Sequence, residues 1–176
     1  MNIFILNSGR CGSTTFIRAC QHMTNYTAAH ESHIHDIGSQ RFAYPEDHIE
    51  ADNRLSWMLG RLDQHYGDSA FYVHLLRSPE AVVQSFVKRA DMGIMKAYRE
   101  GILLHEENNV SAETIAGDYL HTVTTNIECF LKGKARQMRF ELENAQQDFV
   151  TFWDTIGAEG DQLGSLKEWG TVYNAS

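Results

Sequence analysis

A loop rich in glycine and hydroxyl side chains follows the first apolar segment of the chain, and its residue types suit the binding of a phosphate-like anion. Gly9 and Gly12 allow backbone amides to turn inward and approach an anion closely. Ser13 and Thr14 would add hydroxyl donors at the start of a helix, where free N–H groups and the helix dipole favour negative charge. Arg10 adds a fixed positive charge. The stretch therefore predicts a cradle for an anionic group.

The spacing within this loop differs from the Walker A motif of nucleoside triphosphatases. That motif would place glycine at position 7 and lysine at position 13, where the chain has Asn7 and Ser13. Because the lysine that reaches the outer phosphates is missing, ATP hydrolysis is disfavoured. For the loop taken alone, the alternative interpretation is an ordinary glycine-rich turn, since short glycine motifs recur by accident.

A second segment has the residue types for a further phosphate contact. Residues 71–76 are mostly apolar and predict a buried strand, which a helix is expected to follow. Ser78 suits the N-cap of this helix, and Pro79 suits its first turn. Ser85 lies about two helical turns after Ser78 on the same face. Arg77, at the end of the strand, and Ser85 can therefore converge on one anion.

In their order along the chain, these two segments resemble the motifs of sulfotransferases that use 3′-phosphoadenosine 5′-phosphosulfate (PAPS). Residues 10–15, Arg-Cys-Gly-Ser-Thr-Thr, are similar to the 5′-phosphosulfate loop of that family. Residues 77–79, Arg-Ser-Pro, followed by Ser85, are similar to its 3′-phosphate motif. Cytosolic members carry lysine at the first position of the loop segment and an aromatic residue at its last position. Arginine at the first position is common among bacterial and carbohydrate-modifying members.

The resemblance implies a nucleotide site built from both motifs. Its cofactor-binding residues would be Gly9, Arg10, Cys11, Gly12, Ser13, Thr14, Thr15, Arg77 and Ser85. The backbone amides of residues 9–14 would bind the 5′-phosphosulfate together with Arg10 and stabilise charge on the bridging oxygen as the bond breaks. Arg77 and Ser85 would hold the 3′-phosphate, which distinguishes PAPS and its product PAP from ATP-like nucleotides.

Residues 29–36, Ala-His-Glu-Ser-His-Ile-His-Asp, follow a predicted strand over residues 26–29 and are rich in titratable side chains. Their spacing matches neither HExxH nor a closed zinc pattern, so no metal site is expected. Open α/β sheets bind ligands beyond the carboxyl ends of their strands, although a plain polar surface loop is the alternative. The resemblance places the acceptor-activating base at Glu31. His33 and His30 compete for this role, because histidine is the base in cytosolic members.

The implied reaction is transfer of a sulfuryl group from PAPS to a hydroxyl or amine of a small-molecule or carbohydrate acceptor, which the sequence does not identify. Glu31, Arg10 and His33 are the candidate catalytic residues. No metal is required, because a sulfuryl group carries less charge than a phosphoryl group. Two other classes stay open. One is an ATP-dependent small-molecule kinase, which would need magnesium, and the other is a non-catalytic nucleotide-binding module of the same fold.

Composition limits the partners and the cellular location. The formal net charge of −8 argues against a nucleic-acid or anionic-membrane partner, so a doubly anionic cofactor needs a local basic pocket. The chain has three cysteines and no CxxC pair, and its first apolar run is too short for a signal peptide or a membrane span. A cytoplasmic location is therefore expected.

Strand and helix patterns alternate along the 176 residues, which are expected to form a single domain, 1–176. Strands are expected over residues 3–6, 26–29, 71–76 and 137–142. Helices are expected over residues 14–23, 49–66, 79–90, 91–104, 111–132 and 145–156. Residues 38–52 and 105–111 are expected to be loops, and residues 158–176 to be irregular. This alternation predicts an α/β fold, a three-layer sandwich with a central parallel sheet flanked by helices. The resemblance makes it the P-loop-like sulfotransferase fold.

Overall fold

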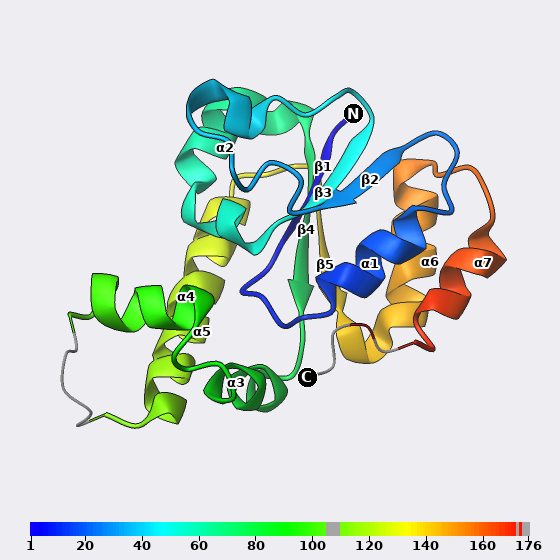
Figure 1. Ribbon diagram of the computed structural model, residues 1–176. Helices are drawn as coiled ribbons and strands as arrows, with labels where there is room; N and C mark the ends of the chain where they lie inside the picture. Colours follow the sequence, from blue (N-terminus) through cyan, green and yellow to red (C-terminus); the bar gives the residue numbers. More distant parts are fainter. Residues whose placement is uncertain (105–109, 172, 174–176) are drawn as a thin grey trace.

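The computed structural model describes residues 1–104, 110–171 and 173, and a five-stranded parallel sheet forms its centre. The strands are β1 (Ile3–Leu6), β2 (Thr27–His30), β3 (His48–Ala51), β4 (Phe71–Leu76) and β5 (Gln137–Glu141). They lie in the order β2-β3-β1-β4-β5 (Figure 1). All four ladders between neighbouring strands are parallel, so the carboxyl ends of the strands meet at one edge of the sheet.

Helices cover both faces of this sheet. They are α1 (Ser13–Cys20), α2 (Leu59–Tyr66), α3 (Pro79–Val87), α4 (Gly93–Ala97), α5 (Ala112–Leu131), α6 (Ala145–Ile156) and α7 (Gln162–Glu168). Helices α1, α6 and α7 lie on one side, and α2 and α5 lie on the other (Figure 1). A short 3₁₀ helix, η2 (Asn53–Trp57), follows β3, and a π-helical turn (Tyr98–Ile102) follows α4. This arrangement confirms the three-layer α/β architecture with a central parallel sheet.

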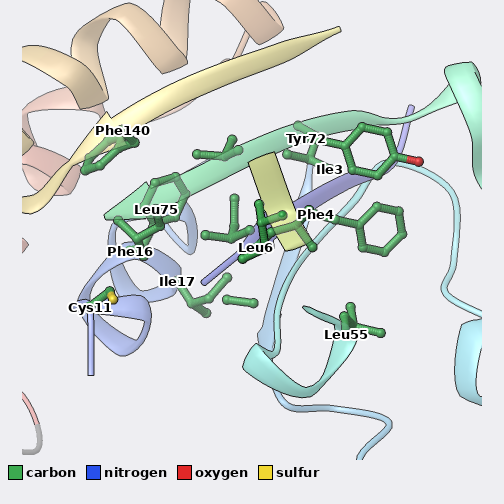
Figure 2. Packing of buried hydrophobic residues seen from close by; sticks show 14 of the residues in the cluster. Ile3, Phe4, Leu6, Cys11, Phe16, Ile17, Leu55, Tyr72, Leu75 and Phe140 are labelled. Atoms are coloured by element: carbon green, nitrogen blue, oxygen red, sulfur yellow. The ribbon is translucent and has the colours of Figure 1, made fainter. Parts of the chain in front are cut away.

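The core consists of apolar side chains on both sides of the two central strands. All four residues of β1 are buried, because the strand is covered on both faces. On the α1 side, the ring centroids of Phe16 and Phe140 lie 4.9 Å apart. On the α2 side, the rings of Phe4 and Tyr72 stack at 6.1 Å (Figure 2). Full burial of such a side chain contributes about 1.5–3 kcal/mol, so the two layers hold the sheet as a rigid platform.

Local sequence signals place the helix ends correctly. The Ser78 hydroxyl accepts a hydrogen bond from the backbone N–H of Ala81 at 3.3 Å, with Pro79 in the first turn of α3. Ser111 caps α5 in the same way. Gly157 ends α6 in the left-handed conformation, with φ of 63°. These caps confirm the expected boundaries, because capping depends on the side chain and backbone of neighbouring residues alone.

Strand β3 was not expected from the sequence. Residues 38–52 were expected to be a loop and residues 49–66 a helix, whereas residues 48–51 form a buried strand between β2 and β1. Two of its four residues, His48 and Glu50, are polar, so the strand lacks the apolar run that indicates a buried strand. Hydrogen bonds to distant residues satisfy these buried groups, so a buried strand forms here although its sequence lacks the apolar pattern of one. The helix that was expected to begin at residue 49 begins at Leu59 as α2.

The segment after α6 was also predicted wrongly. Residues 158–176 were expected to be irregular, but residues 162–168 form α7, which the Asp161 side chain caps by accepting from the Gly164 N–H at 2.9 Å. The Ser165 hydroxyl donates to the Ala19 carbonyl of α1 at 2.9 Å. This packing against α1 stabilises a helix that glycine-rich composition disfavours. The loop expected over residues 105–111 lies largely outside the described residues.

Candidate active site

A cavity of about 1090 Å³ opens at the carboxyl edge of the sheet, where open parallel sheets bind ligands. The loop after β1, the residues after β2 and β4, helix α3 and the C-terminal segment all contribute to its wall. Of the residues singled out in the sequence, the cavity is lined by Gly9, Arg10, Gly12, Ser13, Thr14, Thr15, His30, Glu31, Arg77 and Ser85. Two motifs that are far apart in the sequence therefore line one cavity.

Cys11 and His33 are the two singled-out residues that do not line the cavity. The Cys11 thiol is buried and donates a hydrogen bond to the Gly9 carbonyl at 3.2 Å. Burial raises the pKa of this thiol, so it packs as a small apolar group rather than as a reactive one. Nδ1 of His33 lies 2.9 Å from Oδ2 of Asp36 and 3.0 Å from the Gln40 carbonyl oxygen. These contacts hold His33 within residues 33–40, outside the lining of the cavity.

Buried hydrogen bonds fix the first residues of the loop after β1. The Gly9 N–H donates to Oδ1 of Asn7 at 2.8 Å, and the Ser56 hydroxyl donates to the Asn7 carbonyl at 3.0 Å. The Tyr119 hydroxyl donates to the Ser8 carbonyl at 2.7 Å. A loop fixed in this way needs little rearrangement when it binds an anion, which is the condition for electrostatic stabilisation by preorganised donors.

Glycine is favoured at two positions of this loop by the backbone conformation, and an added Cβ would displace a neighbouring side chain at both. Gly9 and Gly12 adopt φ of 93° and 88°, and Arg10 between them adopts 62°. A Cβ added at Gly12 would lie 2.8 Å from Cδ1 of Leu142, and one added at Gly9 would lie 2.8 Å from Nδ2 of Asn53. The loop is therefore packed between the segment after β5 and η2.

Two arginines donate hydrogen bonds to Ser85, and a third donates to one of these arginines. Nε of Arg10 donates to Oγ of Ser85 at 2.9 Å, and Nη1 of Arg77 donates to the Arg10 carbonyl at 3.2 Å. Nη1 of Arg89 donates to the Ser85 carbonyl at 3.2 Å. Burial lowers the pKa of Arg10, and the charges of Arg89 and Arg77 lower it further. Positive charge is thus gathered in one place although the chain carries a net charge of −8, and an anion bound there would offset the repulsion.

Arg89 and its neighbour Lys88 line the cavity but were not singled out in the sequence. Arg89 follows Ser85 by four residues, so a helix places the two on the same face. That spacing is a signal by which Arg89 could have been found. Asn53 and Arg54 were harder to find, because they follow β3, the strand that the sequence did not indicate.

Glu31 lies at the cavity wall immediately after β2. Its backbone has φ of 54°, and its Oε1 lies 3.0 Å from Nη1 of Arg54. Nε2 of His30 lies 2.9 Å from Oγ of Ser13, at the start of α1. Arg54, which follows β3, thus pairs with the candidate base. Glu31 and His30 are thus the titratable groups of residues 29–36 that reach the cavity.

The lining of the cavity also includes two groups of largely apolar side chains. One group comes from the segment after β5 and the C-terminal segment and comprises Leu142, Ala145, Trp169, Thr171 and Tyr173. The other group comes from α3, α4 and the residue before α4 and comprises Phe86, Met92, Ile94 and Met95. A Cβ added at Gly9 would lie 2.8 Å from Nδ2 of Asn53 and 3.3 Å from Cζ of Phe86, so the second group is next to η2.

Among the described residues, no group of three or more His, Cys, Asp or Glu side chains is placed to hold a metal ion. None of the described helices is long and apolar enough to cross a membrane.

Three solved sulfotransferase structures share the fold. The sulfotransferase domain from the curacin biosynthetic pathway has a TM-score of 0.71 at 16% identity, covering 97% of this chain and 78% of that one. The sulfotransferase domain from the Synechococcus PCC 7002 olefin synthase has a TM-score of 0.65 at 16% identity, with 98% and 78% covered. The sulfotransferase from Alicyclobacillus acidocaldarius has a TM-score of 0.58 at 15% identity, with 91% and 82% covered.

At the level of sequence, neither a protein-family model nor a curated protein matches the chain. The structural likeness therefore confirms the expected sulfotransferase-type fold, while the chemistry is argued from the residues of the cavity.

Proposed function

We propose that this protein transfers a sulfuryl group from PAPS to a hydroxyl or amine of a small-molecule or carbohydrate acceptor. The observation that carries the proposal is the meeting of the two motif residues Arg10 and Ser85, whose Nε and Oγ atoms lie 2.9 Å apart in the cavity. One motif resembles a 5′-phosphosulfate loop and the other a 3′-phosphate site. A ligand that binds both motifs would carry one anionic group at its 5′ position and another at its 3′ position, as PAPS does.

In this proposal the donor lies across the arginines. The backbone amides of residues 9–14, the Arg10 guanidinium and the Thr14 hydroxyl bind the 5′-phosphosulfate. Arg77 and Ser85 bind the 3′-phosphate, with Arg89 contributing positive charge beside them. The apolar side chains around Leu142 and Trp169 contact the adenine ring of the donor. The group of side chains beside η2 is then left for the acceptor.

Glu31 is the proposed base because it lines the cavity immediately after β2 and carries a carboxylate. As the acceptor oxygen or nitrogen forms a bond to sulfur, the bond from sulfur to the bridging oxygen of the 5′-phosphate breaks. The acceptor proton passes to Glu31, and PAP leaves with the negative charge on its 5′-phosphate. Donors fixed around that phosphate stabilise the developing charge. The Arg54 guanidinium, 3.0 Å from Glu31, orients the carboxylate.

The alternative functions fit the cavity less well. A magnesium-dependent kinase would use a lysine in the loop after β1, where the chain has Ser13. A non-catalytic binding module would not need the Glu31 carboxylate at the cavity wall.

The described cysteines are unpaired, and two of them, Cys11 and Cys20, are buried, which suits the reducing cytoplasm that we propose as the location.

A thermal-shift panel of PAP, ADP and ATP, each with and without magnesium, tests the proposal. We expect PAP to raise the melting temperature most, independently of magnesium. A ligand at one hundred times its dissociation constant stabilises the folded state by about 2.7 kcal/mol. Radiolabelled PAPS with a panel of neutral phenols, alkyl alcohols and sugars then tests transfer. Stabilisation by magnesium-ATP in preference to PAP would contradict the proposal and support the kinase.

A further inference from the structure

The carboxylate of Glu50 lies beneath the turn that carries Glu31. Glu50 is on β3 and has no exposed surface. Its Oε1 accepts a hydrogen bond from the Ser32 N–H at 2.9 Å, and its Oε2 accepts one from the Ser32 hydroxyl at 2.6 Å. Ser32 directly follows Glu31 in the chain. A buried, charged acceptor thus binds both donors of the residue next to the candidate base.

The backbone of Glu31 needs such support. Its φ of 54° is a left-handed conformation that residues with a Cβ adopt rarely, and it persists where the surrounding structure holds it. On the N-terminal side, the Glu31 N–H donates to the Ala51 carbonyl at 3.0 Å and extends the ladder between β2 and β3. On the C-terminal side, Glu50 holds Ser32. The Glu31 turn is therefore anchored to β3 on both sides.

Glu50 is itself fixed by the neighbouring residues of the same layer. Nε2 of His48 lies 3.1 Å from Oε2 of Glu50, and Nδ1 of His48 lies 2.8 Å from Oγ1 of Thr27. The Tyr44 ring stacks on His48 with centroids 5.5 Å apart and planes at 9°. A continuous network thus connects Thr27, at the start of β2, to Ser32, beside the cavity.

We propose that Glu50 is a positioning residue for the transfer reaction, because it holds the Glu31 turn through Ser32 and so aims the Glu31 carboxylate into the cavity. Glu50 does not line the cavity and touches neither donor nor acceptor. Its catalytic effect rests on the proposed function, whereas its hold on the turn does not. A base that is displaced by about 1 Å loses of the order of a hundredfold in rate, so a loosened turn would lower turnover.

Substitutions at Ser32 test the inference without disturbing the core, because Ser32 is exposed. Ser32→Ala removes the 2.6 Å bond, and we expect kcat to fall about 3–10-fold while the KM for PAPS stays within twofold of wild type. Ser32→Thr keeps the hydroxyl and should keep kcat. Ser69→Ala, which removes the hydroxyl bond of another exposed serine outside the cavity and the network, is the matched control and should leave kcat unchanged. Glu50→Leu, which removes both acceptor oxygens, should have a larger effect than Ser32→Ala, about 10–100-fold.

A second measurement does not depend on activity. Hydrogen exchange of the Ser32 amide, followed by NMR, should be at least tenfold faster in Glu50→Leu than in the wild type, because the acceptor of the Ser32 N–H is removed, while amides of β4 keep their protection. An unchanged Ser32 amide would overturn the inference. So would full turnover in both Ser32→Ala and Glu50→Leu when Glu31→Gln is impaired, or a loss of melting temperature in Glu50→Leu with no loss of kcat in Ser32→Ala. Absence of transfer from PAPS in the wild type would instead contradict the proposed function, and the exchange measurement would still decide whether Glu50 holds the turn.

Discussion

Nε of Arg10 donates a hydrogen bond of 2.9 Å to Oγ of Ser85, although 75 residues separate the two in the sequence. The bond joins the loop after β1 to helix α3 at the wall of the cavity. Arg77 in turn donates to the Arg10 carbonyl. The two motif segments are therefore one structural unit.

The bond between Arg10 and Ser85 predicts that the two residues are energetically coupled in nucleotide binding. Arg10→Ala and Ser85→Ala should each weaken PAP binding, and the double variant should lose less than the sum of the two by about 0.5–3 kcal/mol, because either change removes the same bond. Isothermal titration calorimetry of the four proteins completes the cycle. Strictly additive losses would mean that Arg10 and Ser85 bind the nucleotide independently.

Arg77→Ala should weaken PAP binding by about 2–4 kcal/mol, as expected for loss of a charge-assisted contact to phosphate. Binding of 5′-AMP should change much less, because that nucleotide lacks the 3′-phosphate. Lys88→Ala, which changes an exposed cation of the same cavity, is the control and should have a smaller effect. Equal losses for PAP and 5′-AMP would show that Arg77 does not bind the 3′-phosphate.

Glu31→Gln keeps the shape of the side chain and removes its basicity, so kcat should fall about 10²–10⁴-fold with little change in PAP affinity. His33→Ala should have a mild effect, since His33 pairs with Asp36 outside the cavity wall. Steady-state kinetics and PAP titration of each variant separate the two quantities. A large loss of kcat in His30→Ala, with Glu31→Gln active, would move the base to His30.

Gly12→Ala should lower the free energy of unfolding by about 1–2 kcal/mol, because alanine is strained in the left-handed backbone conformation of Gly12. The contact of the new Cβ with Cδ1 of Leu142, at 2.8 Å, should lower it further. Adding Leu142→Ala should remove the steric part and leave the backbone part. Gly60→Ala, in α2, meets no atom within 4 Å and should stabilise the protein by up to about 1 kcal/mol. Urea denaturation measures all of these, and a Gly12→Ala protein as stable as wild type would refute the steric argument.

His74 predicts a loss of stability in acid. Burial lowers its pKa to about 4 from an ordinary value of 6.5, and the charge of Arg139 adds to the effect. Between these two values the unfolded chain binds a proton that the folded chain does not, so stability falls as the pH decreases from 6.5 towards 4. The full shift corresponds to roughly 3 kcal/mol. His74→Leu should remove this part of the pH dependence, and the exposed His35→Leu should retain it.

Features that depend on neighbouring residues could be predicted from the sequence. The strand at residues 71–76, the Ser78 cap and the glycine-rich loop all follow from short-range rules of burial, capping and backbone freedom. The two motif segments belong to this group, because each consists of a strand, a turn and the first part of a helix. Their order along the chain was enough to indicate the sulfotransferase-type fold.

Only the tertiary structure showed strand β3 and what it holds in place. Glu50 is buried and charged, and its partner Ser32 precedes it by 18 residues, so no local pattern could indicate either the strand or the contact. The same holds for the pairing of Glu31 with Arg54 and for helix α7, whose Ser165 bonds to Ala19 over 146 residues. A buried polar group is stable where a distant donor satisfies it, and the position of that donor is set by the packing of the whole sheet.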